Sequence, residues 1–290
     1  MTNNKTTCRI CGSPKQKEIG HENQAGQSFT ILRCDNCSLI FVREIYSPVS
    51  PEYSELHDLD IGGDFIWRQT AHKRTAHILC LDIFKRYFQM EPVSKKPTLL
   101  DVGCGIGGFL RFAHESFNCY GFDASPRQAH YANKYFPHVR CATSLAEYKK
   151  QCDFPFPAFD FITLWDVLEH IRNPKAFLDD LAGALSPRGL IFIAVPGAET
   201  MRIKSSLISK GWPKARFSWN PQEHVSYFTP KSLSLLLTKC HLRVVKTGTM
   251  PVYPRSLSVF EAIRRFGFAV LRAFPNLAPQ FFILAEKRPL

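Results

Sequence analysis

The sequence predicts an α/β fold in which a parallel β-sheet is covered by helices on both faces. Short apolar runs with strand character alternate with helical stretches through the middle of the chain. These runs are apolar throughout rather than at every second position, which is typical of strands that are buried on both faces. A glycine-rich stretch, residues 103–108, follows the first run and indicates a sharp turn from strand to helix.

The composition is that of an ordinary globular protein. The chain has 290 residues, of which 45% are hydrophobic, and no apolar run is long enough to span a bilayer. The first residues, MTNNKTTC, lack the apolar core of a secretory signal. We therefore expect a cytoplasmic protein.

The positive charge is concentrated in the last third of the chain. The formal net charge is +12, and residues 197–290 hold 15 Lys and Arg against 4 Asp and Glu. This excess favours an acidic substrate, anionic lipid or nucleic acid in that region. The alternative is a solvated basic surface without a specific partner.

Two CxxC pairs lie near the N-terminus, formed by Cys8 with Cys11 and by Cys34 with Cys37. Each pair can aim two thiolates at one ion, and together they complete a tetrahedral four-cysteine site with no open position. We predict a structural Zn²⁺ in a zinc ribbon over residues 1–45; two disulfides or a redox pair are the alternatives. The net charge of the ribbon is close to zero, which does not favour nucleic-acid binding by this segment.

Residues 46–97 are predicted to form a linker and packing helices. Residues 46–63 contain Pro and Gly among acidic and aromatic residues, which indicates a loop. From Asp64 to about Met90, apolar residues recur at helical spacing. A polar, Pro-bounded break then precedes the first strand of the sheet.

The alternation continues in order after the glycine stretch. We expect a helix at 109–117, a strand at 118–123, a helix from Ser125 and Pro126, and strands near 139–142, 159–165 and 189–195. Residues 197–228 are long, basic and aromatic, and interrupt the pattern. A helix at 230–240, a strand at 242–249, an amphipathic helix at 259–274 and a last strand at 280–285 complete the chain.

The glycine stretch by itself fits two cofactors. Gly103, Gly105 and Gly108 match a dinucleotide fingerprint, whereas Gly103, Gly105 and Gly107 match the tighter loop that holds S-adenosylmethionine. Asp123 follows 18 residues after Gly105, where both nucleotide families place a carboxylate for the ribose hydroxyls.

Further landmarks resemble a class I S-adenosylmethionine-dependent methyltransferase. They are residues 100–107 (LDVGCGIG), 121–123 (GFD), 159–160 (FD), 165–170 (WDVLEH) and 185–190 (LSPRGL). Asp101, two residues before the first glycine, is typical of that family. The resemblance implies a Rossmann-like, seven-stranded sheet with an antiparallel last strand over residues 98–290, with a substrate insertion at about 197–228. The CxxC pairs and residues 221–229 (PQEHVSYFT) are similar to bacterial methyltransferases with an N-terminal zinc ribbon that act on sugars or other small molecules.

The resemblance also implies a cofactor site for S-adenosyl-L-methionine. The loop of Gly103, Gly105 and Gly107 would wrap the methionyl part, with Asp101 near its ammonium. The remaining implied contacts are Asp123 and Ala124 at the ribose, Thr143 in the segment 142–145 at the adenine, and Leu164, Trp165 and Asp166 beside the methionyl end.

Three residues are candidates for catalysis. Asp166 and His170 follow the fourth strand, where sheets of this type bind ligands, and an imidazole can take a proton near neutral pH. The alternative is that Glu169 and His170 stabilise the start of a helix. Ubiquinone-pathway O-methyltransferases carry a similar cluster linked to a divalent cation, but with Glu where this chain has Asp166. His224, in the insertion, is either a base or a histidine that fixes its loop.

We predict a methyltransferase that acts on a small biosynthetic acceptor, either a sugar derivative or a quinone-like phenol. The alternatives are an RNA methyltransferase and a non-catalytic S-adenosylmethionine-binding scaffold. The basic, Phe-rich helix at 259–274 either packs on the sheet or contacts a membrane surface to reach a lipid-linked acceptor. We expect no nucleic-acid partner, and the sequence does not determine the oligomeric state.

Overall fold

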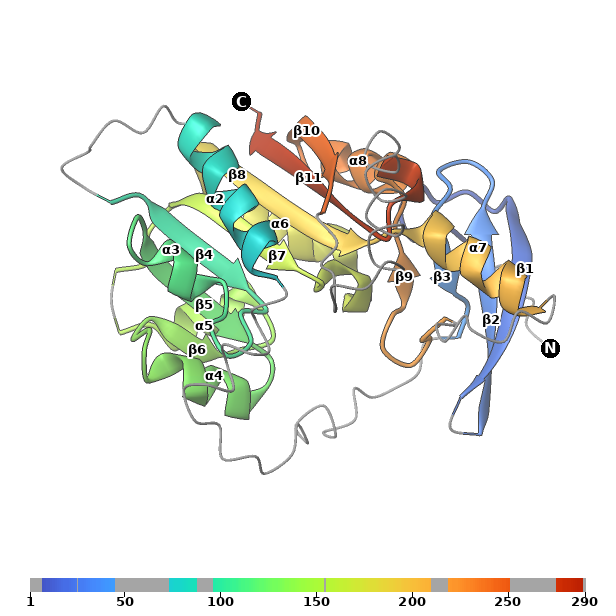
Figure 1. Ribbon diagram of the computed structural model, residues 1–290, viewed down its shortest axis with the longest axis horizontal. Coiled ribbons are helices and arrows are strands. Elements are labelled where there is room, and N and C mark those ends of the chain that lie inside the picture. Colours follow the sequence, from blue (N-terminus) through green and yellow to red (C-terminus); the bar gives the residue numbers. More distant parts are fainter. Residues whose placement is uncertain are drawn as a thin grey trace, which may run out of the picture.

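A computed structural model describes most of the chain (Figure 1). The described residues are 7–24, 26–44, 73–87, 96–153, 155–209, 219–250 and 275–288. The expected helix at 259–274 and most of the expected linker at 46–97 lie outside them. No helix in these described ranges is both long and apolar enough to cross a membrane.

A seven-stranded sheet forms the main body. Its spatial order is β10 (Leu242–Thr249), β11 (Gln280–Lys287), β8 (Leu185–Pro196), β7 (Phe159–Trp165), β4 (Thr98–Val102), β5 (Asn118–Asp123) and β6 (Val139–Cys141). β4 to β8 pair in parallel, whereas β11 runs antiparallel to both of its neighbours. The predicted fold class, a Rossmann-like sheet with an antiparallel last strand, is confirmed.

Helices cover both faces of this sheet because alternate strand residues point to opposite sides. Leu99, Phe161 and Phe192 pack with α2 (Arg74–Tyr87), α3 (Leu110–Ala113) and α4 (Pro126–Asn133). Their neighbours along the strands, such as Leu100 and Ile162, face α5 (Leu145–Lys150), α6 (Pro174–Ala184) and α8 (Pro230–Lys239). Because both faces of these strands are buried, their sequences are apolar at nearly every position.

Three elements differ from the expected ones. α3 ends at Ala113, four residues before the predicted end of that helix. β8 starts at Leu185 rather than Gly189, because Phe159 already pairs with Leu185. The region expected as an irregular insertion opens with a helix, α7 (Ala198–Ser209).

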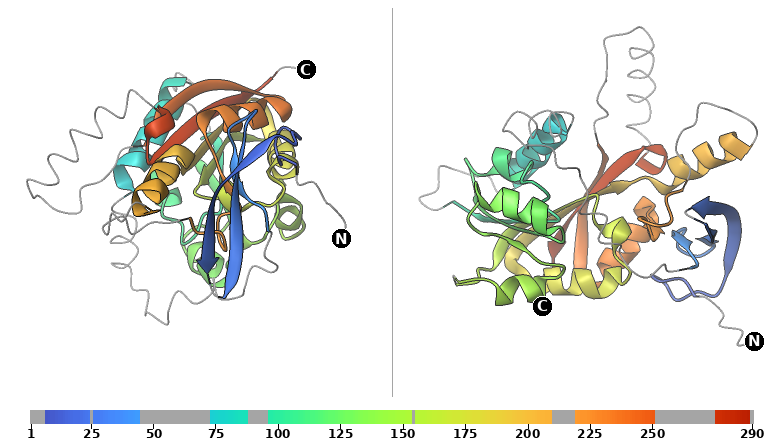
Figure 2. Two further views of the ribbon diagram at one scale, coloured as in Figure 1. Left: turned by 90° about the vertical axis from the view of Figure 1, so that its right-hand side faces the viewer. Right: turned by 90° about the horizontal axis from the view of Figure 1, so that it is seen from below.

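The N-terminal ribbon, residues 7–24 and 26–44, lies at the end of the molecule opposite β6 (Figure 1). Its strands are β1 (Gln16–Gln24), β2 (Gln27–Cys34) and β3 (Ile40–Val42), which pair antiparallel. A fourth strand, β9 (Ser226–Tyr227), comes from the region after α7 and pairs with β3. Figure 2 shows the ribbon beside β9 and α7 in both of its views.

The ribbon shares its core with the large sheet. Its cysteines, with Leu39 and Phe41, belong to the same buried cluster as strand residues Ile191 and Phe281. A second cluster joins Phe29 and Ile31 of β2 to Trp219 and Tyr227. The ribbon is therefore packed onto the α/β domain rather than tethered beside it.

Candidate functional site

The glycine loop forms a cradle at the carboxyl end of β4. Gly103, Gly105 and Gly107 all have positive φ angles, of +68°, +55° and +84°. A Cβ atom at Gly103 would lie 2.5 Å from Cγ2 of Val167, and one at Gly107 would lie 2.8 Å from Cε2 of Phe136. Both the backbone conformation and the space therefore require glycine, as expected of a loop that approaches a ligand closely.

Asp123 sits at the end of β5 and faces this loop. Its carboxylate accepts hydrogen bonds from the backbone N–H groups of Gly105 and Ser125, each at 2.8 Å. Burial raises the pKa of this carboxyl. Ala124 follows at the surface. The N–H of Ala142 donates to the Asp123 carbonyl at 3.0 Å, so the segment that continues into the exposed Thr143 lies beside the end of β5.

Asp101 lies beneath the loop and is only 2% exposed. The hydroxyl of Thr163 on the neighbouring strand donates to its Oδ1 at 2.8 Å. Burial raises the pKa of Asp101 to about 7, and the charge of Asp123 adds to the shift. A cationic group bound nearby would favour the ionised carboxylate.

Asp166 directly follows strand β7 and has a left-handed conformation with φ +56°. Nζ of Lys73 lies 2.8 Å from one carboxylate oxygen, and Nε2 of Gln280 donates to the other at 2.5 Å. Few residues other than glycine adopt this conformation, and such outliers cluster at functional sites.

The two residues before Asp166 contribute mainly to the core. Leu164 is fully buried in the cluster that faces α6, so its side chain is not available to a ligand. Trp165 packs on the opposite face, with its ring centroid 5.2 Å from that of Phe109 and 5.1 Å from that of Phe192.

Glu169, His170 and His224 meet beside this edge of the sheet. The first two lie on the 3-10 helix η2 (Leu168–His170), and His224 comes from the segment before β9. The imidazole centroids are 4.7 Å apart in an edge-on arrangement. One ligand atom from each residue lies within 4.8 Å of the other two.

Hydrogen bonds and burial affect the protonation of these three side chains. His170 Nδ1 lies 2.8 Å from the carbonyl oxygen of Glu223, which can only accept, so Nδ1 carries the proton. Both oxygens of Glu169 and Nδ1 of His224 are buried without a hydrogen-bond partner among the described residues. Burial, and then the charge of Asp166, raises the pKa of Glu169 well above its ordinary value.

The cluster can therefore do two things chemically. Burial lowers the pKa of His224 to about 4, so its imidazole is neutral at pH 7 and can accept a proton. One carboxyl group and two histidine side chains are also a common ligand set for a divalent metal ion. The unpartnered atoms of Glu169 and His224 point to a ligand in either case.

The four ribbon cysteines are gathered at one point. Their sulfur atoms all lie within 4.8 Å of one another, with Cys8 3.5 Å from Cys37 and Cys11 3.5 Å from Cys34. These separations exceed a disulfide bond, and all four thiols are free. They are close to the roughly 3.8 Å between ligands of a tetrahedral zinc–thiolate site, so the residues fit a structural zinc ion.

The sequence did not indicate the partners of these groups. Lys73 and Gln280 contact Asp166 from segments far from it in the chain, and neither lies in a recognisable motif. Arg9 is another such residue: it stands between two cysteines, and its guanidinium reaches the carbonyl oxygen of Val225, next to His224. Only the tertiary contacts reveal these roles.

Sequence comparison finds relatives among methyltransferases. The probable chloroplastic tocopherol O-methyltransferase of Oryza sativa subsp. japonica is 30% identical over 36% of this chain and 30% of its own. The mitochondrial ubiquinone biosynthesis O-methyltransferase of Arabidopsis thaliana is 28% identical over 55% of this chain and 52% of its own. The matches thus span 30% and 52% of the lengths of these two curated relatives.

Solved structures share the fold. A methyltransferase structure from a Haloferax volcanii complex with the Trm112 activator has a TM-score of 0.54 at 13% identity and covers 85% of this chain and 100% of the other. The plantazolicin methyltransferase BpumL, solved with S-adenosylhomocysteine (SAH), has a TM-score of 0.53 at 21% identity, covering 83% and 94%.

A family model described as "Methyltransferase domain" matches residues 71–247, from the start of α2 into β10. This range includes the glycine loop, both buried aspartates and the Glu169–His170–His224 cluster. The prediction of a methyltransferase from the sequence is confirmed, and the chain belongs to the methyltransferase domain family.

Proposed function

We propose that this protein transfers a methyl group from S-adenosylmethionine to a small biosynthetic acceptor. One observation carries the proposal: a glycine cradle lies on the same edge of the sheet as a Glu–His–His cluster in which Glu169 is buried and both histidines are half-buried. The first feature suits a nucleoside cofactor, and the second suits an acceptor that must lose a proton.

The cradle supplies the donor side. The N–H-rich loop at residues 103–107 would wrap the methionyl part, and Asp123 would bind the ribose hydroxyls once its present bonds to Gly105 and Ser125 adjust. Asp101 would hold the ammonium. When bound, S-adenosylmethionine supplies a methyl group on a sulfonium centre, which leaves as a neutral thioether.

The histidines supply the acceptor side. His224 would take the proton from the acceptor hydroxyl as the new bond to the methyl group forms. Burial lowers its pKa to about 4, so the imidazole is unprotonated at pH 7 but weakly basic, and the negative charge of Asp166 opposes this decrease. His170 orients the loop by donating from Nδ1 to the carbonyl of Glu223.

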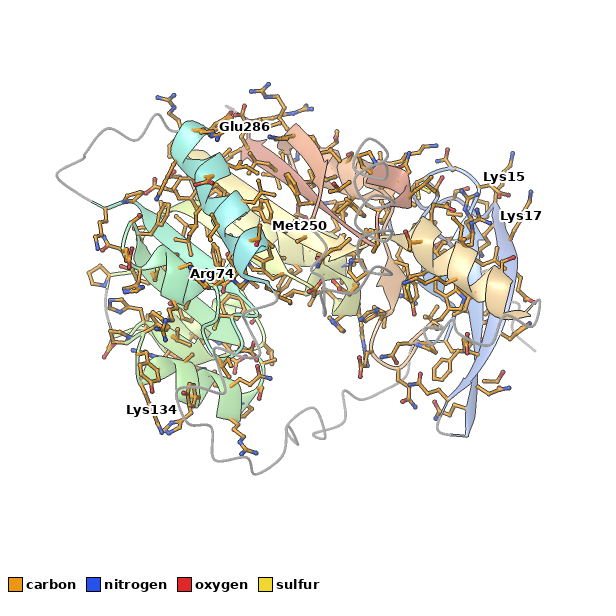
Figure 3. All side chains as sticks on the ribbon, viewed as in Figure 1. Lys15, Lys17, Arg74, Lys134, Met250 and Glu286 are labelled. Atoms are coloured by element: carbon orange, nitrogen blue, oxygen red, sulfur yellow. The ribbon has the colours of Figure 1, made fainter. Side chains whose placement is uncertain are left out.

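A quinone-like phenol fits this site better than RNA does. The two relatives described above are named for tocopherol O-methylation and for ubiquinone biosynthesis. The arginines of the ribbon are engaged within the chain: Arg9 with backbone carbonyls, Arg33 with Glu199 and Arg43 with Glu18. Figure 3 shows Lys15 and Lys17 on the outer side of the ribbon, away from α2 and Arg74.

His224→Ala tests the acceptor chemistry. Purified protein is incubated with methyl-labelled S-adenosylmethionine and a cell extract, and the labelled product is identified by mass spectrometry. The variant should lose turnover by roughly 100-fold or more, because a general base contributes that much, and should bind SAH as the wild type does.

His130→Ala is the matched control, because His130 is exposed on α4. It should leave turnover and SAH binding unchanged. Unchanged turnover in His224→Ala would remove this residue from the mechanism. Label in RNA would replace the small acceptor by a nucleic acid, and SAH binding without any labelled product would indicate a scaffold protein.

A further inference from the structure

Arg9 of the ribbon reaches the backbone of the residue that follows His224. Its Nη1 donates to the carbonyl oxygen of Val225 at 2.8 Å, and its Nη2 donates to the carbonyl oxygen of Val42 at 2.5 Å. The guanidinium carbon lies 5.5 Å from the ring centroid of Phe41, which packs beneath it. A planar, forked donor is well suited to bridge two carbonyl groups in this way.

Val225 connects this contact to the Glu–His–His cluster. Its carbonyl oxygen accepts from Arg9 and from the N–H of Val42, the latter at 3.2 Å, while its own N–H donates to the carbonyl of Glu169 at 3.0 Å. The backbone on either side of His224 is thus held between the ribbon and η2. His170 adds its bond to the carbonyl of Glu223.

We propose that Arg9 is a positioning residue for methyl transfer: by holding the 223–225 backbone, it sets His224 against His170 and Glu169. The proposal rests on the function proposed above. It assigns the ribbon a part in turnover that is separate from cofactor binding, because no contact of Arg9 involves the glycine loop, Asp101 or Asp123.

The matched control uses another cation that ties the ribbon to the domain. Nζ of Lys239, on α8, donates to the carbonyl oxygen of Ile10 at 2.9 Å, one residue from Arg9. This contact joins the same segment of the ribbon to the domain but does not contact residues 223–225. Comparing Arg9→Met with Lys239→Met therefore separates positioning of His224 from attachment of the ribbon.

The full-length protein is measured with two readouts. In Arg9→Met, kcat should fall about tenfold or more, since small displacements of catalytic groups are costly, while KM for S-adenosylmethionine and the Kd of SAH stay within about twofold. Arg9→Lys, which keeps the charge and the stem over Phe41, should be intermediate. Lys239→Met should keep the kcat of the wild type.

The second readout does not need turnover. The ring centroids of His170 and His224 are 4.7 Å apart, so their ring protons should show a nuclear Overhauser effect in histidine-labelled protein. The zinc content of every variant is checked as a control. We expect this effect to be lost in Arg9→Met and kept in Lys239→Met. If Arg9→Met does not fold, a weakened effect in Arg9→Lys supports the proposal and an unchanged one overturns it.

The outcomes separate the two proposals. Equal losses of kcat in Arg9→Met and Lys239→Met, or an unchanged ring-to-ring signal in Arg9→Met, would overturn the positioning role. The wild type could instead methylate no acceptor while its ring-to-ring signal is still lost in Arg9→Met. That result would support the positioning of His224 by Arg9 and reject the proposed function.

Discussion

At the scale of single residues, Asp101 shows how burial gives a common side chain an unusual property. Among the described residues, its carboxylate accepts one side-chain hydrogen bond, from Thr163; the residue is 2% exposed, and burial raises its pKa to about 7. Between its ordinary value of 3.8 and pH 7, the folded protein therefore binds more protons than the unfolded chain. The contribution of Asp101 to stability consequently decreases as the pH rises through this window.

Cofactor binding should depend on pH in the opposite direction. An ammonium group beside Asp101 favours the ionised carboxylate, so SAH should bind about tenfold more weakly for each pH unit below pH 7 and with constant affinity just above it. Isothermal titration calorimetry from pH 5.5 to 8 measures this. Asp101→Asn should remove the dependence, whereas Asp180→Asn, exposed on α6, should keep it. A flat profile in the wild type would place the ammonium elsewhere.

At the scale of elements, the loop after β4 owes its shape to glycine. Gly107 combines a φ of +84° with a neighbour, Phe136, that leaves no room for a side chain. Gly183 on α6 is the opposite case, since a Cβ there would meet nothing within 4 Å. One glycine is required by its loop, and the other weakens its helix.

Gly107→Ala should distort the cradle. We expect a loss of about 1–3 kcal/mol in the free energy of unfolding from backbone strain, and weaker SAH binding. Gly183→Ala should instead stabilise the protein by about 0.5–1 kcal/mol and leave binding unchanged. Thermal unfolding and calorimetry check both. Wild-type affinity in Gly107→Ala would show that the cofactor does not depend on this loop.

At the scale of the whole molecule, the ribbon and the α/β domain share one core. The cysteine knuckles turn through left-handed residues, Gly12 and Ser38, and their cysteines belong to the same buried cluster as apolar residues of the large sheet. β3 of the ribbon also pairs with β9. Loss of the metal should therefore destabilise the α/β domain as well as the ribbon.

Metal removal tests this coupling. Elemental analysis should find about one zinc ion per chain, which is lost in Cys34→Ser and kept in Cys141→Ser, a cysteine outside the cluster. Strong chelation should lower the unfolding temperature of the entire protein in one transition, because the core is shared. Two separate transitions would mean that the ribbon folds independently, and absence of zinc in the wild type would exclude the site.

Most of the fold could be predicted from the sequence, because its signals are local. Continuous apolar runs identified the buried strands, Ser125 and Pro126 marked the start of α4, and Cys8, Cys11, Cys34 and Cys37 share one small cluster as their spacing indicated. The exceptions are elements without a local signal. α7 was not expected, since its hydrophobic periodicity is weak, and the two-residue strand β9 exists only through its pairing with β3.

The sequence by itself thus determined the glycine loop, the seven-stranded sheet with its antiparallel last strand and the cysteine cluster, since each depends on neighbouring residues or on a fold with fixed topology. Only the tertiary structure decided which distant groups meet. His170 and His224 touch across 54 residues of chain, Lys73 reaches Asp166, and Arg9 reaches Val225. The physical reason is that such contacts are set by how complete elements pack, and no short-range pattern in the chain records that packing.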